Sequence, residues 1–152
     1  MLRSILIGLV AGQRAMTPLA AVATAARRGR VADDAPLAGL LKKPVVAGGA
    51  VALAALEMAG DKMKSAPDRI VPSGMIARSL TSAYAGAALA PGGRRVAGGA
   101  LAVAAALGAS YVGWRLRCAT MRRYGQTATG FVEDVLVLGS GLAIALGDKR
   151  PA

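Results

Sequence analysis

The sequence predicts an all-α fold, a polytopic membrane helix bundle of about five transmembrane helices. Apolar residues make up 55% of the 152 residues, aromatic residues make up only 3%, and the mean hydropathy is +0.49. Such a chain lacks the large side chains of a soluble core, whereas membrane helices pack closely through small residues. The apolar residues also fall into five runs separated by charged segments. We therefore expect a single integral membrane domain over residues 1–152.

Each apolar run is predicted to be one transmembrane helix, because about 20 helical residues cross a bilayer core of about 30 Å. The runs lie at residues 2–26, 44–60, 75–90, 96–114 and 130–146. Arg14 and Pro18 interrupt the first run, which argues against a cleaved signal peptide and predicts a retained helix kinked at Pro18. Pro44 suits the first turn of the second helix.

The connections between the runs have distinct compositions. Residues 27–43 contain a predicted interfacial helix, with Asp33 or Asp34 as N-cap and Pro36 in its first turn. Ser73 is predicted to cap the third helix, and Pro-Gly-Gly at 91–93 predicts a tight turn after it. Residues 115–130 are predicted to form a basic loop with an amphipathic part on the lipid headgroups.

The net charge is +11, from 19 basic and 8 acidic residues. The basic residues lie mostly between the apolar runs, where they would face the anionic headgroups of a lipid bilayer. No aromatic stacking platform or groove-reading motif accompanies them, so nucleic acid is not an expected partner. Lysine and arginine are almost equally divided between the two sides of the predicted bundle, so the positive-inside rule assigns no orientation. A single orientation and an antiparallel dimer inserted both ways up remain alternatives.

The residue types present restrict the chemistry. The chain has no histidine and one cysteine, Cys118, so it has no internal disulfide and no nitrogen–sulfur metal site. A nucleophile paired with a base is also missing. We therefore expect no catalytic residue, no enzyme activity and no cofactor, and the only ligands left open are a small ion or a lipid.

Ionisable residues inside or at the ends of the predicted helices are the candidate site, because such residues are costly in lipid and usually face the protein interior. This predicted intramembrane polar site consists of Arg14, Glu57, Asp61, Arg78, Glu133 and Asp134. Arg14 is expected to face Glu57 or Asp61, which share one helix face because they are four residues apart. The predicted supporting residues are Gly12, Thr17, Pro18, Lys62, Pro67, Arg69 and Pro72.

Two functions are compatible with these charges. Carboxylates that line a water-filled pocket relay protons or hold a cation, as expected of a small transporter, channel or flippase-like protein. The alternative is a membrane scaffold or lipid-binding partner, in which the charges only fix helix packing. Short matches between residues 11–15 and 112–116, and between 59–62 and 146–149, would relate the two halves by an inverted repeat, a feature of transporters.

The third run carries a face of small residues suited to tight packing, and we expect a second copy to pack there in a homo-oligomer. This face comprises Ser79, Ser82, Ala83, Gly86 and Ala87.

Three blocks of the sequence resemble the bacterial integral membrane family known as domain of unknown function 4126. They are AGQRAMTPLA near the start, LEMAGDKMKSAPDRIVPSGMIARSLTSAYAGAAL in the middle and FVEDVLVLGSGLAIAL near the end. The family pattern maps to Gly12 and Arg14, Glu57 with Asp61 and Lys62, Pro67, Arg69 and Pro72, Arg78, and Glu133 with Asp134. Lys64 stands where the pattern has a proline. The resemblance implies a multi-pass protein of the bacterial inner membrane and implies no activity.

Overall fold

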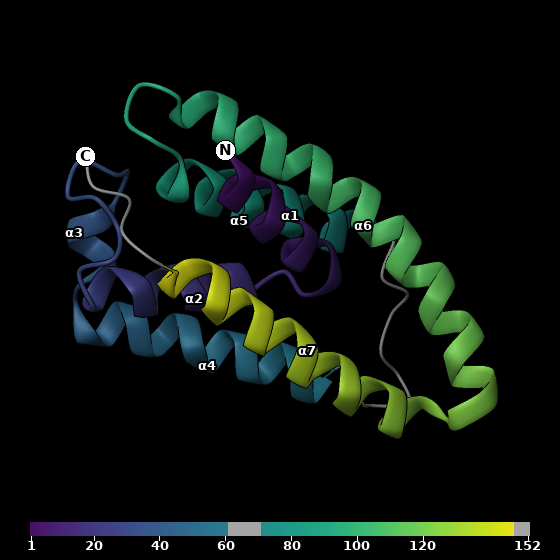
Figure 1. Cartoon of the computed structure of the whole chain (residues 1–152). Helices are drawn as coiled ribbons and strands as arrows, with labels where there is room; N and C mark the ends of the chain where they lie inside the picture. The colour runs from purple at the N-terminus through teal and green to yellow at the C-terminus, as the bar shows by residue number, and fades with distance from the viewer. Residues whose placement is uncertain (61–70, 148–152) are drawn as a thin grey trace.

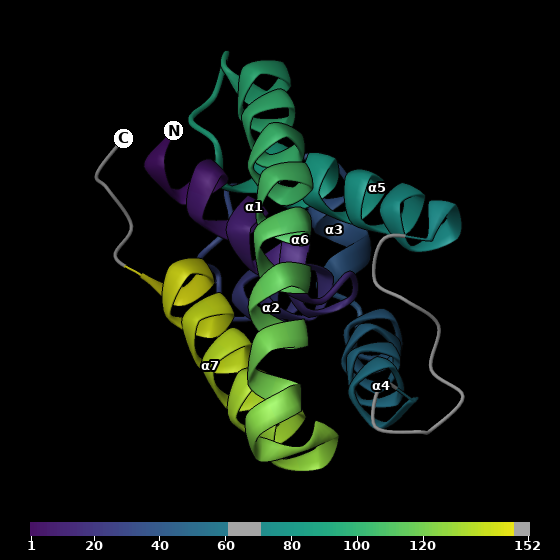
Figure 2. The ribbon, with the colours of Figure 1, turned by 90° about the vertical axis from the view of Figure 1, so that its right-hand side faces the viewer.

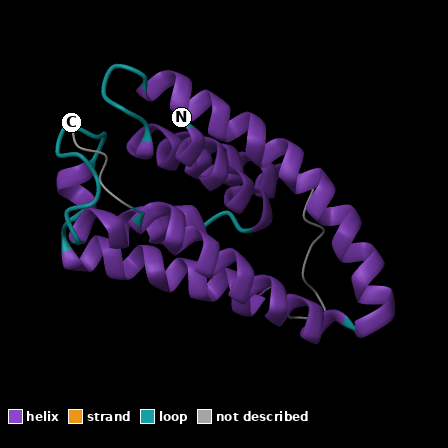
Figure 3. Cartoon of the chain, viewed as in Figure 1, coloured by secondary structure: helices purple, strands orange, loops and turns teal. Residues whose placement is uncertain are grey.

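The computed structural model describes residues 1–60 and 71–147, which are all-helical apart from their connections (Figures 1 and 3). The predicted all-α class is therefore confirmed over these residues. The helices are α1 (Leu2–Gln13), α2 (Thr17–Arg27), α3 (Ala38–Leu41), α4 (Pro44–Gly60), α5 (Pro72–Leu89), α6 (Arg95–Tyr124) and α7 (Gln126–Leu146).

The helices form two groups that lie one above the other in Figure 1. In the first group α6 packs on α1 and α5, and in the second α2 packs on α4 and α7. The chain passes from the first group to the second between α1 and α2. Figure 2 shows the molecule from the side, with α1 and α5 crossing α6 in the upper half and α6 continuing downward past α2 until it meets α7 at the bottom. The residues that join α1 to α2 therefore lie between the two groups.

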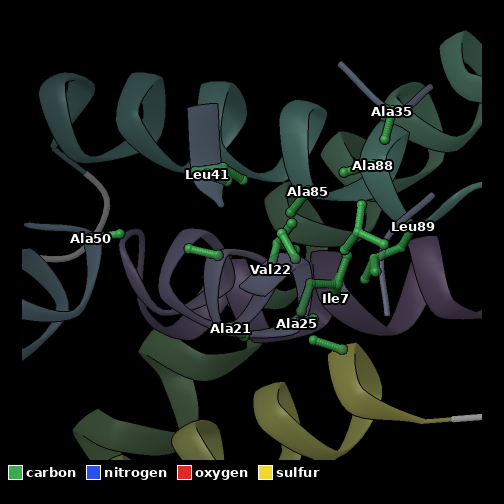
Figure 4. Close-up of a cluster of buried hydrophobic side chains, with 14 of the residues drawn as sticks. Ile7, Ala21, Val22, Ala25, Ala35, Leu41, Ala50, Ala85, Ala88 and Leu89 are labelled. Atoms are coloured by element: carbon green, nitrogen blue, oxygen red, sulfur yellow. The ribbon is translucent and has the colours of Figure 1, made fainter. Parts of the chain in front are cut away.

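The interior is built from small residues and the exterior from large ones. Of the 25 apolar residues that are buried in the described part of the chain, 18 are alanine. Figure 4 shows part of this core, where Ala21, Ala25 and Ala85 surround Ile7 and Val22. Large apolar side chains face outward instead; on α7, for example, more than 60% of Phe131, Val132, Val135 and Leu136 is exposed. An exposed apolar patch of this kind is typical of a surface that contacts another protein or a membrane.

Glycines let the helices of the first group cross at short distance. A Cβ atom on Gly12 of α1 would lie 2.6 Å from the carbonyl oxygen of Ala106 on α6, and one on Gly99 of α6 would lie 2.9 Å from that of Ala83 on α5. Gly86 of α5 lies equally close to the backbone of Gly98. The small-residue face predicted on the third run therefore packs against α6 of the same chain, which leaves Gly86 and Ala83 covered without a second copy.

Two helices, α6 and residues 127–146 of α7, are long and apolar enough to cross a membrane. α1 and α4 are apolar but shorter. By length and composition, the described residues therefore contain two helices able to cross a membrane, and the predicted number of about five transmembrane helices is not confirmed.

The first predicted helix, residues 2–26, is two helices. Arg14 has an extended backbone (φ −141°, ψ 122°), and α2 begins at Thr17 with Pro18 in its first turn. A proline inside a helix clashes with the carbonyl group four residues earlier, which here belongs to Arg14, whereas a proline in the first turn is tolerated. The prediction of one helix kinked at Pro18 is wrong, because the chain breaks before Pro18.

The basic loop predicted at residues 115–130 is also wrong. α6 continues from Arg95 to Tyr124 without interruption, and α7 starts at Gln126 rather than at residue 130. No glycine or proline lies between Trp114 and Tyr124, and arginine is a good helix former. Gly125, with φ of +80°, makes the turn that separates the two helices.

Several details of the helix ends test the remaining predictions. α4 has the predicted bounds and begins at Pro44, and the predicted turn after α5 forms between Pro91 and Arg94. α5 begins at Pro72 instead of residue 75, so Ser73 lies within it and does not cap it. α3 has one turn with Leu37 as N-cap, so the predicted caps Asp33 and Asp34 are wrong too. Both aspartates instead form ion pairs, with Lys42 and Arg95 respectively.

Candidate functional site

Glu57 of α4 binds the break between α1 and α2. Its carboxylate accepts hydrogen bonds from the backbone N–H groups of Ala15, at 2.7 Å, and Met16, at 2.8 Å. These two N–H groups have no helical partner because they lie just before the first turn of α2. A carboxylate is also favoured at this place by the dipole of α2. Glu57 therefore stabilises the broken helix. The predicted pairing of Glu57 with Arg14 is wrong, and the alternative partner, Asp61, lies outside the described residues.

Arg14 forms an ion pair with Asp134 of α7. The Nε and Nη2 atoms of Arg14 donate hydrogen bonds of 2.9 and 2.6 Å to Oδ1 of Asp134. Only 2% of the Arg14 side chain is exposed, so the pair is almost fully removed from solvent. It connects the end of α1 to a helix 120 residues later in the sequence. We call Arg14, Glu57 and Asp134 the polar centre.

Thr17 lies in the first turn of α2, next to the polar centre along the chain. Its hydroxyl oxygen is buried and makes no hydrogen bond with any described residue. Its methyl group packs near Gly141 of α7. Most buried hydroxyl groups in proteins are hydrogen-bonded, so the Thr17 hydroxyl is a group at this position that could still donate or accept a hydrogen bond.

A second ion pair involves Glu133, the residue that precedes Asp134 on α7. Nη1 of Arg117 on α6 lies 3.4 Å from Oε2 of Glu133. Arg117 is 9% exposed, so this pair is largely buried as well. The adjacent carboxylates of Glu133 and Asp134 thus bind arginines of two different helices.

The other end of α1 is fixed to α7 by Arg3. Its guanidinium donates to the carbonyl oxygens of Ile144, at 3.0 Å, and Ala145, at 2.8 Å. These carbonyls belong to the last turn of α7, where a cation is favoured. Because Arg3 contacts the last turn of α7 whereas Arg14 contacts Asp134, which lies earlier in the same helix, α1 runs antiparallel to α7.

A cavity of about 1180 Å³ opens between α1, α6 and α7. We call it the lateral groove. Most of the side chains that line it are apolar, and they include Leu6, Leu9, Val10, Val112, Leu136 and Val137. Its polar side chains include Gln13, Arg117, Thr120, Tyr124, Thr129 and Glu133. Gln13 and Glu133 are the chain neighbours of Arg14 and Asp134, so the lateral groove borders the polar centre.

The other predicted site residues differ in their surroundings and in whether the structure describes them. Arg78 is buried on α5, where its Nη1 lies 4.0 Å from the sulfur of Met75. Gly12 supports the site by close packing on α6, and Pro72 starts α5 at the surface. The predicted residues Asp61, Lys62, Pro67 and Arg69 lie outside the described residues. Within residues 1–60 and 71–147, no group of three acidic or cysteine side chains is close enough to hold a metal ion.

Sequence reasoning missed Arg117 and Gln13. Arg117 was assigned to a loop, although Gly113, Arg117 and Met121 recur every four residues and so share one helix face. The Arg117 side chain also contacts the Met121 sulfur at 3.3 Å. Gln13 donates a hydrogen bond of 2.9 Å from Nε2 to the carbonyl oxygen of Ala109, an interaction that depends on the α1–α6 crossing.

No family model, curated protein or solved structure matches the chain. The resemblance to domain of unknown function 4126 therefore stays a prediction.

Proposed function

We propose that this chain is a multi-pass protein of the bacterial inner membrane. The outward-facing leucine and valine side chains support this placement, because lipid is the environment in which they need no cover. The alanine and glycine interior is also typical of helices packed in lipid. The shorter apolar helices α1 and α4 would then lie within the membrane as parts of the bundle rather than as complete spans.

We further propose that the protein is a small transporter whose moving ion is a proton or small cation. The observation that carries this proposal is the broken first helix, with Glu57 bound at the start of α2 and Arg14 buried against Asp134. Helices interrupted within the membrane, with a charged group at the end of a half-helix, are a recurrent feature of secondary transporters. Ionisable residues buried in such proteins commonly relay protons.

The polar centre suggests how transport would proceed. The ion pair holds α1 against α7, since both donor atoms of Arg14 bind the same oxygen of Asp134. Proton transfer to Asp134 would weaken the pair and free Arg14 to move. Glu57 and the Thr17 hydroxyl supply further proton-binding or hydrogen-bonding groups at the same break.

Proton flux into liposomes tests this proposal. The purified protein is reconstituted with a pH-sensitive dye inside, and a potassium gradient with valinomycin drives proton entry. We expect flux above that of protein-free liposomes, and loss of most of it in Glu57→Gln, which removes the charge but keeps an oxygen acceptor for the break. Asp34→Asn is the matched control, since Asp34 is exposed outside the polar centre and its loss should leave flux unchanged.

Absence of flux under both proton and sodium gradients would contradict the transport proposal. Equal flux in the native protein and Glu57→Gln would show that transport does not use the polar centre.

A membrane scaffold is the second candidate function. It is favoured by one observation, which is that Arg14 is 2% exposed and already bonded to Asp134. In this case the ion pair would only fix how α1 packs on α7. The scaffold would show no flux, and loss of the pair would alter assembly.

A further inference from the structure

The lateral groove has the form of a binding site for a long, thin molecule. It follows α7 from Ala128 to Ile144, a distance of roughly 24 Å at 1.5 Å per helical residue. One leaflet of a bilayer core is about 15 Å thick, half of the whole core. The lateral groove is therefore long enough for one lipid acyl chain, and its apolar walls suit that chain.

The two ends of the lateral groove differ in polarity. Leu6 and Ile144 lie near one end, where α1 begins and α7 finishes. Thr120, Tyr124 and Thr129 lie near the other end, where the turn at Gly125 joins α6 to α7. The oxygen of the Thr129 hydroxyl is buried and has no hydrogen-bond partner among the described residues. A ligand with an apolar tail and a hydrogen-bonding head would satisfy both ends.

The charge at the polar end indicates the type of head. The last ten residues of α6 contain Arg115, Arg117, Arg122 and Arg123 and no acidic residue. Arg117 lines the lateral groove, and the Arg123 guanidinium lies 5.6 Å from the ring centre of Tyr124, which also lines it. Glu133 balances only one of these four cations. Arginine forms strong, directed hydrogen bonds with phosphate oxygens.

We propose that the lateral groove binds an anionic phospholipid, with one acyl chain between α1, α6 and α7 and the phosphate near Arg122 and Arg123. This inference rests on the membrane placement proposed above and does not depend on transport. A neutral phospholipid would fit the apolar walls but would leave the arginines without a counter-charge. A second copy of the chain would have to enter a cavity whose polar end is strongly basic on both copies.

The single tryptophan of the chain provides the test. Trp114 does not line the lateral groove but follows Gly113, which does, so we expect a brominated acyl chain bound there to quench its fluorescence across this short separation. The native protein is reconstituted in vesicles of phosphatidylcholine that contain either brominated phosphatidylglycerol or brominated phosphatidylcholine. We expect quenching by the anionic lipid to exceed quenching by the neutral lipid at equal content.

Two matched glycine variants separate binding in the lateral groove from contact with bulk lipid. Gly108 lines the lateral groove, and a Cβ atom there would meet no atom within 4 Å. Gly108→Leu therefore places a large side chain on the wall of the lateral groove, beginning from a Cβ position that is open, and should reduce quenching by the anionic lipid to the level of the neutral lipid. Gly139 on α7 is equally open but does not line the lateral groove, so Gly139→Leu should leave the quenching unchanged.

A charge variant tests the position of the phosphate. Arg122→Gln combined with Arg123→Gln should lower the preference for anionic over neutral lipid by about thirtyfold, since each of the two arginines contributes on the order of 1 kcal/mol near an anionic surface. Arg27→Gln with Arg28→Gln is the control at the exposed end of α2. Equal quenching by both lipids, or full anionic quenching in Gly108→Leu, would overturn the proposal. Chemical crosslinking of the reconstituted protein is the second readout. A crosslink between two copies that forms in the native protein and is lost in Gly108→Leu, with quenching unchanged, would overturn the proposal in favour of a second copy in the lateral groove.

Discussion

At the scale of single residues, buried and exposed charges have different roles in this protein. Arg14 and Asp134 are buried, and removing one partner of a buried ion pair costs about 3–5 kcal/mol in known cases. The pair of Asp34 and Arg95 joins the connection after α2 to the start of α6, at 2.7 Å, but lies at the surface. Exposed pairs of this kind contribute little to stability.

Asp34 should nevertheless titrate at an unusually low pH. The hydrogen bond from Arg95 lowers the pKa of this carboxyl below its ordinary value of about 4. Because the folded-state pKa is lowered, the stabilisation from Asp34 is complete above the unfolded-state pKa and is lost as pH falls through the folded-state pKa. Carbon-13 NMR of the Asp34 carboxyl in micelles should record the low value.

Arg95→Gln provides the comparison for this titration. It removes the cation but keeps a side chain able to donate a hydrogen bond, so the Asp34 pKa should rise toward that of a free aspartate. An Asp34 pKa that is the same in both proteins would mean that the ion pair does not persist in solution.

The identity of the buried charges could be predicted from the sequence, but their partners could not. Arg14, Glu57 and Asp134 stand out because charges within apolar runs are costly. The sequence predicted that Arg14 faces Glu57 or Asp61; Arg14 binds Asp134 and Glu57 binds backbone N–H groups, while Asp61 lies outside the described residues. Which groups meet depends on how the helices cross, and this information lies in contacts between residues far apart in the chain.

At the scale of helices, close crossings depend on single glycines. A Cβ atom on Gly12 would lie 2.6 Å from the Ala106 carbonyl oxygen and 2.9 Å from the Ser110 nitrogen. Both are backbone atoms of α6, so they cannot rotate away. Gly12→Ala should therefore force α1 away from α6 and lower the free energy of unfolding by about 1–3 kcal/mol. Unfolding by denaturant in mixed micelles measures this change.

Gly48→Ala is the matched control on α4. Gly48 is exposed, and a Cβ atom there would meet nothing within 4 Å. Alanine should be neutral or stabilise the helix by up to about 1 kcal/mol. Equal stability of the two variants would contradict the close crossing of α1 and α6.

Helix positions were predicted more accurately than helix continuity. The bounds of α4 follow from its apolar run and from Pro44, both of which are local features. The break after Gln13 and the extension of α6 to Tyr124 were missed. The break requires Glu57, from another helix, to bind the freed N–H groups. The extension was missed because a cluster of arginines was taken to indicate a loop, although arginine is compatible with a long helix.

At the scale of the whole molecule, the broken helix connects two helix groups and contains Arg14, the most buried arginine in the described part of the chain. The sequence matches that suggested an inverted repeat have different local structures, because residues 11–15 lie at the break and residues 112–116 lie within α6. Two neighbouring helices of the first group contact α7 at separate charged residues, with Asp134 bound to Arg14 at the end of α1 and Glu133 bound to Arg117 of α6. A change of charge on α7 would therefore alter contacts with both neighbouring helices.

The most direct test of the proposed role of the polar centre is proton flux through Arg14→Met combined with Asp134→Leu. This double variant replaces the ion pair by apolar side chains, a change that is often neutral or stabilising when both partners are removed together. We expect a folded protein of near-native stability, checked by the same unfolding assay, with flux reduced to that of protein-free liposomes. Native flux in this folded variant would contradict the claim that the buried ion pair takes part in transport.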